Sequence, residues 1–178
     1  DRDLTVARAC KASKPEDQAF LLYVLTYVAA PKNVIELGTN LGISTAYIDA
    51  ALQESNPEAR LWTLEVSPNR LGIACEMHPA LDLNNVEYVQ GQFADTLEET
   101  LPPIKSVDLA FIDGHHKYYP TLQYFDLISS YVKKMIINLY SKGTYKSFYN
   151  KEKDKLYIND KPLGFLTLFL KKLLIKNN

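Results

Sequence analysis

The segment from Val34 to Thr45 constrains the fold of this chain more than any other. A short apolar run, 34–37, leads through a turn with Gly38 and Gly42 into residues with helical spacing. Glycine has no Cβ and lets a ligand approach the backbone, and the first turn of a helix offers unpaired N–H groups. A strand, turn and helix of this kind are typical of α/β folds that bind ligands at the carboxyl ends of their strands.

The rest of the chain continues this alternation of strand and helix. Apolar runs predict further strands over residues 60–64, 86–89, 107–112 and 135–140. Helical spacing predicts helices over residues 15–30, 44–52, 68–78, 93–101 and 119–131. Together they predict a Rossmann-like α/β fold, with a mostly parallel sheet and helices on both faces.

Acidic residues stand where the predicted strands end. Glu36 lies near the end of the first strand and would supply a negative charge for a cationic group. Glu65 follows the second strand, where folds of this class place an acid on ribose hydroxyls. Asp113 directly follows the strand over 107–112. A dinucleotide site would need a further glycine in the turn, which this chain lacks, so an enzyme linked to nicotinamide adenine dinucleotide (NAD) is disfavoured.

Three segments resemble class I S-adenosylmethionine (SAM) dependent methyltransferases, and among these the small-molecule O-methyltransferases. They are Glu36-Leu37-Gly38-Thr39, Ile43-Ser44-Thr45, and the run from Phe111 to Tyr118 with residues 121–125 after it. The resemblance covers residues 33–131 and implies SAM as cofactor and a small acceptor, methylated at a hydroxyl oxygen. The cofactor residues that it implies are Glu36, Gly38, Thr39, Asn40, Gly42, Ser44, Thr45, Glu65, Val66, Gly91, Gln92, Phe93 and Asp113. Glu65 would bind the ribose, residues 91–93 would frame the adenine, and helix 15–30 would cover the pocket.

Candidate catalytic residues cluster after the fourth strand. Asp113, His115 and His116 are the only group of potential bases at a strand end. A histidine suits proton abstraction because its ordinary pKa is about 6.5, which predicts His116 or His115 as the base. The alternative is that a histidine caps the next helix or packs against tyrosines. His78, at the end of a predicted helix, is expected to stabilise the helix dipole.

A metal site is a weaker expectation. In metal-dependent relatives an Asp at the position of Asp113 helps to hold Mg²⁺. The acidic pair that would complete such a site is missing after the strand over 135–140, where only Asn138 offers an oxygen ligand. Mg²⁺ dependence is therefore not favoured.

The last quarter of the chain differs in charge from the rest. Residues 1–132 carry 9 Lys and Arg against 18 acids, whereas residues 133–178 carry 11 lysines against 3 acids. This segment predicts an antiparallel hairpin over 145–150 and 155–158, then a helix over 163–175. That helix has apolar residues nearly all round, and we rank its placements as packing on the sheet, a homodimer interface, and an anionic membrane surface.

The length and composition fit one domain, with a helical cap over 1–32, a cofactor-binding core over 33–140 and a basic end over 141–178. Two cysteines without metal-ligand spacing and no secretory signal predict a cytoplasmic protein with reduced thiols. Two functions stay open: a methyltransferase, or a SAM- or nucleotide-binding protein without activity whose basic end contacts a macromolecule. Nucleic acid is not favoured as a partner, because residues 133–178 contain no arginine.

Overall fold

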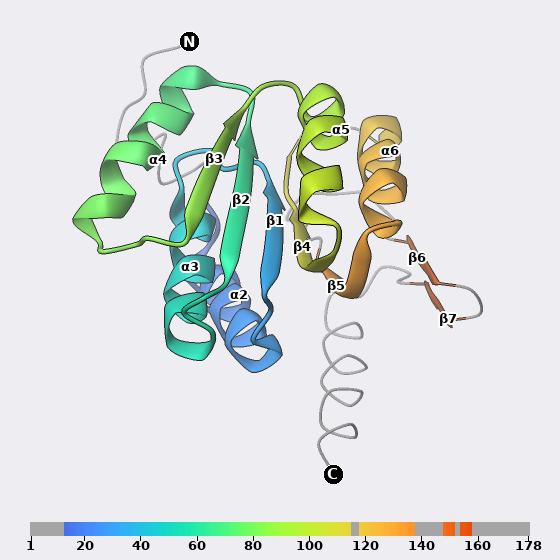
Figure 1. Cartoon of the computed structure of the whole chain (residues 1–178), viewed down its shortest axis with the longest axis horizontal. Helices are drawn as coiled ribbons and strands as arrows, with labels where there is room; N and C mark the ends of the chain where they lie inside the picture. Colours follow the sequence, from blue (N-terminus) through green and yellow to red (C-terminus); the bar gives the residue numbers. More distant parts are fainter. Residues whose placement is uncertain (1–12, 115–117, 138–147, 152–153, 158–178) are drawn as a thin grey trace. The chain divides into compact units, whose positions relative to one another are not determined.

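The computed structural model describes residues 13–114, 118–137, 148–151 and 154–157. The chain divides into two units, residues 1–139 and residues 140–178. The first unit contains a five-stranded sheet in which every pair of neighbouring strands is parallel, with helices on both sides (Figure 1). This arrangement confirms the predicted fold class.

Strands and helices alternate along the first unit. The strands are β1 (Asn33–Leu37), β2 (Arg60–Glu65), β3 (Val86–Gln90), β4 (Val107–Ile112) and β5 (Val132–Ile137), in the order β3-β2-β1-β4-β5. The helices are α2 (Glu16–Ala29), α3 (Ile43–Ser55), α4 (Pro68–Ala80), α5 (Phe93–Ile104) and α6 (Tyr118–Ser129). Four of the five predicted strands lie within one residue of these bounds, and all five predicted helices lie within three residues.

The strand order creates a crevice at one edge of the sheet. β1 lies between β2 and β4, and the helix that follows β1 covers the opposite face from the helix that follows β4 (Figure 1). Chain segments that leave neighbouring strands toward opposite faces open a ligand crevice at the strands' carboxyl ends. The predicted site residues in the loops after β1, β2 and β4 therefore share one edge.

Buried apolar residues lie on α2 and α3 as well as on α5 and α6, and one large hydrophobic cluster fills the α5 and α6 side of the sheet. Apolar side chains of β1 and β4 meet the inner faces of these two helices, and Phe93 packs edge-on against Tyr124 with ring centroids 5.7 Å apart. A Cβ on Gly114 would collide with the Phe93 ring. The backbone of the loop after β4 therefore packs directly against this ring. The core thus fixes where the β4 loop runs.

The start of β5 was predicted wrongly. The strand begins at Val132 and not at Met135, so that two lysines belong to it. Its register against β4 shifts between Val107 and Leu109. These two residues are two positions apart on β4, whereas their partners on β5, Val132 and Met135, are three positions apart. A bulge of this kind takes up an extra residue, and no pattern in the sequence marks it.

In the second unit, β6 (Phe148–Lys151) and β7 (Asp154–Tyr157) pair antiparallel, with Phe148 opposite Tyr157. The predicted helix over 163–175 lies outside the described residues.

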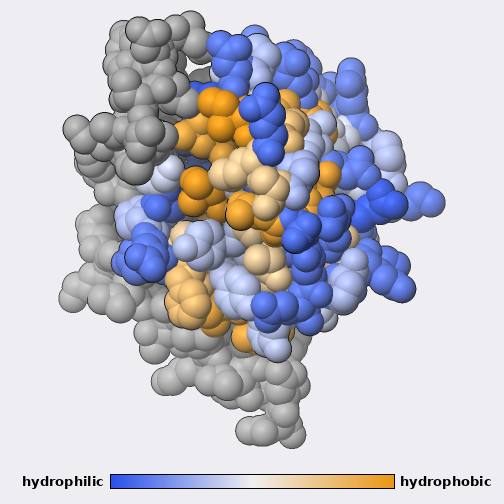
Figure 2. All heavy atoms as spheres, turned by 90° about the vertical axis from the view of Figure 1, so that its left-hand side faces the viewer, coloured by the Kyte–Doolittle hydropathy of each residue, from blue (hydrophilic) through white to orange (hydrophobic). Residues whose placement is uncertain are grey.

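None of the helices that the structure describes has both the length and the apolar character needed to cross a membrane. On the face of the molecule drawn in Figure 2, apolar surface gathers in the middle and hydrophilic surface borders it.

Candidate functional site

The loop between β1 and α3 is the centre of the candidate site. Three of its residues have positive φ: Gly38 at 100°, Asn40 at 51° and Gly42 at 81°. A Cβ on Gly38 would lie 2.9 Å from the backbone oxygen of Asp113. Gly38 is therefore required because the ends of β1 and β4 come close together here. The prediction had given a different reason, the close approach of a ligand to the backbone.

Glu36 is completely buried beneath this loop. Its Oε1 accepts a hydrogen bond from Ser44 Oγ at 2.6 Å, and its Oε2 accepts from Thr45 Oγ1 at 2.6 Å and Thr63 Oγ1 at 2.7 Å. Burial raises the pKa of Glu36, and these three hydroxyls oppose the rise. We predicted a carboxylate facing a cationic group. The structure instead gives this carboxylate hydroxyl partners on α3 and β2, which hold the start of α3 against the sheet.

The same network reaches the loop itself. The Thr63 hydroxyl proton goes to Glu36, so in the 2.6 Å contact between the Thr39 and Thr63 hydroxyls Thr39 is the donor. Thr39 is buried, with 1% of the residue exposed. Its N–H donates to the Leu64 carbonyl at 3.2 Å. The first turn of the loop is thus fixed from the interior side.

Glu65 holds the middle of the loop from the end of β2. Its Oε2 accepts from the Asn40 N–H at 2.8 Å, and its Oε1 accepts from the Ser67 N–H at 2.9 Å. The first bond stabilises Asn40 in the left-handed backbone conformation, which Asn adopts more readily than most residues other than glycine. Glu65 lies at the edge of the sheet formed by the carboxyl ends of the strands, as predicted. Each of its carboxylate oxygens has a second lone pair that can accept from a further donor.

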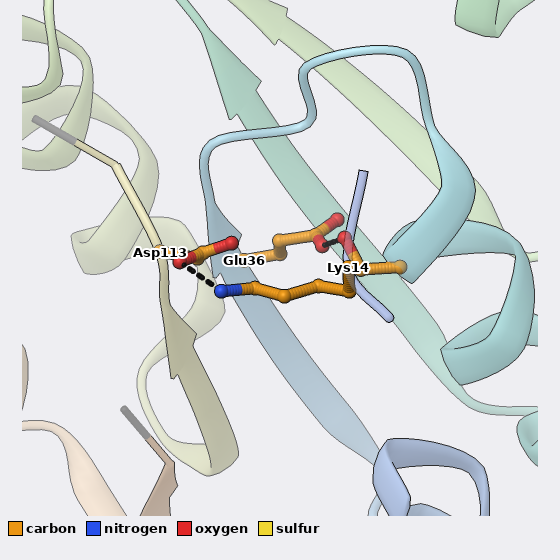
Figure 3. A network of polar contacts seen from close by, with 4 residues as sticks. Lys14, Glu36 and Asp113 are labelled. Atoms are coloured by element: carbon orange, nitrogen blue, oxygen red, sulfur yellow. Dashed lines mark hydrogen bonds and ion pairs between the residues drawn. The ribbon is translucent and has the colours of Figure 1, made fainter. Parts of the chain in front are cut away.

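A small pocket, partly open to solvent, lies in front of this loop. It is lined by loop residues 38–41, 43 and 44, by Asp113, and by Ser13 and Lys14. Lys14 comes from the segment before α2 and extends past Glu36, so that its Nζ lies 2.7 Å from Asp113 Oδ1 (Figure 3). Both side chains are largely buried, with 11% and 17% exposed. Sequence reasoning found Asp113 but missed Ser13 and Lys14, for which no motif gave a signal.

The predicted cofactor residues that follow β2 and β3 differ in how they are placed. Val66 is 53% exposed beside Glu65, and the Gly91 N–H donates to the Glu65 carbonyl at 3.0 Å, which places the β3 loop next to the β2 loop. The Phe93 side chain, in contrast, packs in the core against Tyr124. Phe93 is 7% exposed, whereas Gln92 precedes α5 as its N-cap.

His78 has a different position from the one predicted. It lies in the last turn of α4, but its side chain is completely buried. Its Nε2 is 2.8 Å from the Gly42 carbonyl oxygen, and its Nδ1 is 2.6 Å from the Tyr88 hydroxyl. The prediction of a residue that only stabilises a helix dipole was wrong, because the ring turns inward to two specific partners.

The predicted bases His115 and His116, and the predicted oxygen ligand Asn138, lie outside the described residues. Among the residues that the structure does describe, no group of three His, Cys, Asp or Glu side chains is arranged to hold a metal ion. The Lys14 ammonium lies against the Asp113 carboxylate. The assignment of the base and the role of Mg²⁺ remain predictions.

Comparison with known proteins identifies the class. Residues 35–136 match the family described as Methyltransferase domain, which is more than half of the chain. The chain belongs to this family. The match begins in β1, ends in β5, and therefore includes the loop, the pocket acids and the strand order described above.

Two solved structures and one curated relative illustrate the likeness. A putative O-methyltransferase from Klebsiella pneumoniae is 25% identical with a TM-score of 0.64, covering 71% of this chain and 56% of that one. An O-methyltransferase from Bacillus cereus, solved in complex with S-adenosylhomocysteine (SAH), is 26% identical with a TM-score of 0.63, covering 71% and 57%. A tRNA (guanine-N(7)-)-methyltransferase from Aromatoleum aromaticum is 34% identical over 91 residues, which are 50% of this chain and 33% of the relative. The chain thus spans little more than half the length of the two solved proteins.

The Glu36 network predicts a large loss of stability on truncation. Glu36→Ala would leave the hydroxyls of Ser44, Thr45 and Thr63 without their acceptor, and we expect the free energy of unfolding to fall by about 2 kcal/mol or more. Urea denaturation followed by circular dichroism measures this change. Glu87→Ala is the control, since it removes an exposed carboxylate paired with Arg60 and should cost less than about 1 kcal/mol. Equal effects of the two substitutions would contradict the importance of the buried carboxylate.

Proposed function

We propose that this protein transfers the methyl group of SAM to a hydroxyl oxygen of a small acceptor. The observation that carries the proposal is the pocket at the crevice between β1 and β4, where the loop after β1, Lys14 and Asp113 converge. Membership in the methyltransferase family supports the reaction class. The likeness to the Bacillus cereus O-methyltransferase in complex with SAH supports the cofactor and an oxygen acceptor.

The charges around the pocket favour a cationic cofactor. Glu65 and Asp113 place two carboxylates at the ends of β2 and β4, and one ammonium, that of Lys14, lies beside Asp113. A pyrophosphate would add two negative charges to this group and would be repelled. SAM carries a positive sulfonium, which the Asp113 carboxylate would attract. Glu65 does not discriminate between the two cofactors, because dinucleotide-binding folds also place an acid on the ribose.

The amino-acid end of SAM matches the Lys14–Asp113 pair. This end is a zwitterion, with an ammonium and a carboxylate on neighbouring atoms. An ammonium of the protein and a carboxylate of the protein, 2.7 Å apart and both largely buried, form the complementary pair. In the bound state Asp113 would accept from the cofactor ammonium and Lys14 would donate to the cofactor carboxylate, each through a charge-assisted hydrogen bond.

The nucleoside end would extend toward β2 and β3. Glu65 would accept from the ribose hydroxyls with the lone pairs left after it binds the Asn40 and Ser67 amides. Val66 offers exposed apolar surface beside it for the adenine ring, and Gly91 and Gln92 follow β3 next to it. This orientation leaves the sulfonium near the end of β4.

The chemistry then needs alignment and a base. A sulfonium is an activated leaving group, so the protein must hold the acceptor oxygen in line with the methyl group and remove its proton. His116 or His115, directly after the β4 loop, would take that proton. An Mg²⁺ ion at Asp113 would lower the pKa of a bound hydroxyl and offer an alternative way to deprotonate the acceptor. The Lys14–Asp113 pair favours the mechanism that needs only the histidine.

The first prediction from the proposed function concerns the loop glycine. Isothermal titration of the purified protein should show binding of SAM and SAH and none of NADH. Gly38→Ala should weaken SAH binding by about tenfold or more, because a Cβ there meets the Asp113 backbone and φ is 100°. Gly72→Ala is the matched control, since a Cβ at this position has no neighbour within 4 Å. Binding of NADH, or unchanged SAH affinity of Gly38→Ala, would contradict the assignment of the loop.

The second prediction tests recognition of the zwitterion. Lys14→Met should weaken SAH binding by about tenfold, the loss of one charge-assisted hydrogen bond. It should leave the affinity for 5′-deoxy-5′-methylthioadenosine unchanged, because that nucleoside lacks the amino-acid end. Lys32→Met, an exposed lysine outside the pocket, is the control. Tighter SAH binding by Lys14→Met would show that Lys14 only competes with the cofactor.

The third prediction concerns the base. In an assay with radioactive SAM and a panel of small hydroxyl compounds, His116→Ala or His115→Ala should lower turnover by roughly 10²-fold or more. SAH affinity should remain unchanged, which separates loss of the base from loss of the site. Full turnover in both variants would mean that alignment alone supports the reaction.

A nucleic-acid acceptor is the second candidate. One observation favours it, the 34% identity to a tRNA (guanine-N(7)-)-methyltransferase over half of this chain. The 11 lysines among residues 133–178 would suit a phosphate backbone, although no arginine is present there for bidentate contacts. The same assay with transfer RNA as acceptor decides between the candidates. A protein without activity would bind the cofactor and transfer no methyl group to either acceptor.

A further inference from the structure

The carbonyl oxygen of Gly42 has two hydrogen-bond partners. It accepts the first backbone hydrogen bond of α3 from the Ala46 N–H at 2.9 Å, and it lies 2.8 Å from His78 Nε2. Both lone pairs of the oxygen are thus used. Leu41 and Ile43, on either side of Gly42, line the pocket. The contact with His78 therefore acts directly on the backbone behind the candidate cofactor site.

His78 connects this backbone to two other elements. It belongs to α4, and its Nδ1 lies 2.6 Å from the hydroxyl of Tyr88 on β3. The two rings also stack, with centroids 5.7 Å apart and planes 25° from parallel. The imidazole is completely buried. It therefore has no access to a ligand in the pocket and can influence the site only through Gly42.

The partners determine the tautomer of the ring. A carbonyl oxygen can only accept, so Nε2 must carry the proton. In the neutral ring Nδ1 must then accept from the Tyr88 hydroxyl. Burial raises the pKa of Tyr88 to about 12, and that hydroxyl keeps its proton at neutral pH. The order of donation runs from Tyr88 to His78 to Gly42.

Gly42 and His78 fit each other sterically. A Cβ at position 42 would collide with the imidazole and would lie 2.8 Å from the Cβ of Ala74. The second glycine of the motif is therefore explained by this side chain from α4, which occupies the space that a side chain at 42 would need. Removing the imidazole would leave a cavity behind the loop and free one lone pair of the carbonyl.

We propose that His78 is a positioning residue for the cofactor loop. By donating to the Gly42 carbonyl it holds the loop at the start of α3 in the conformation that binds the cofactor, while it contacts no ligand itself. The inference rests on the proposed function, since it assigns the loop to SAM. It goes beyond that function because it makes affinity depend on a buried pair, His78 and Tyr88, on the far side of the loop.

Two amide substitutions separate the two contacts of the ring. The amide nitrogen of Gln can replace Nε2 and donate to Gly42, whereas Asn places its amide near Nδ1 and reaches only Tyr88. We expect His78→Asn to weaken SAH binding by roughly three- to tenfold, the effect of one lost hydrogen bond, and His78→Gln to bind within about twofold of the wild type. Isothermal titration gives the affinities, and thermal unfolding of each variant gives its stability.

Controls distinguish positioning from general destabilisation. Ile128→Val shortens a completely buried side chain at the end of α6, away from the site, and should lower the melting temperature without changing SAH affinity. Backbone amide exchange over residues 39–44 should be faster in His78→Asn than in His78→Gln. Should His78→Asn fail to fold, Tyr88→Phe carries the test, since it removes only the hydroxyl that orients the ring and should also weaken binding.

The possible outcomes are distinct. Rescue of affinity by Gln and not by Asn supports the proposal, as does weaker binding by Tyr88→Phe when Asn does not fold. Equal affinity of the Asn, Gln and Tyr88→Phe variants to the wild type overturns it and leaves the proposed function intact. Failure of the wild-type protein to bind SAH or SAM overturns both.

Discussion

The candidate site depends on one buried carboxylate. An ionised group removed from water is costly unless hydrogen bonds replace its hydration. Glu36 receives three such bonds, from two residues at the start of α3 and one on β2. These bonds are satisfied only when β1, β2 and α3 have their native positions. The carboxylate therefore links the order of the central strands to the direction in which the chain leaves β1.

The loop is fixed from its interior side at three points. Glu36 binds the start of α3, Glu65 binds the Asn40 amide, and His78 lies against the Gly42 carbonyl. Each contact leaves the pocket side of the loop open. A loop that is already in place does not lose conformational freedom when a ligand binds, which favours affinity. The positive φ of Asn40 is stable here because the surrounding contacts impose it.

Periodicity in the sequence was enough to predict the architecture of the first unit. Alternating apolar runs and helical spacing indicated the parallel sheet, and the positions of the strand ends indicated that Glu65 and Asp113 share one edge. The contacts of Lys14 with Asp113 and of His78 with Gly42 join residues far apart in the sequence, and each needs a side-chain direction that no local pattern records. The start of β5 was missed for a similar reason, because a bulge has no signature there.

The two glycines of the motif show how far a motif can support a function. Gly38 is required by the approach of the Asp113 backbone, and Gly42 by the imidazole of His78. Both requirements come from packing within the protein, so they would persist in a descendant of this fold that no longer bound a cofactor. The glycines are therefore evidence for the fold more than for the reaction. The residues that should differ between an enzyme and a protein without activity are the charged pair in the pocket and the predicted base after β4. Of these, Lys14 is the more informative, because its ammonium is largely buried beside Asp113 and burying an ammonium carries a high desolvation cost.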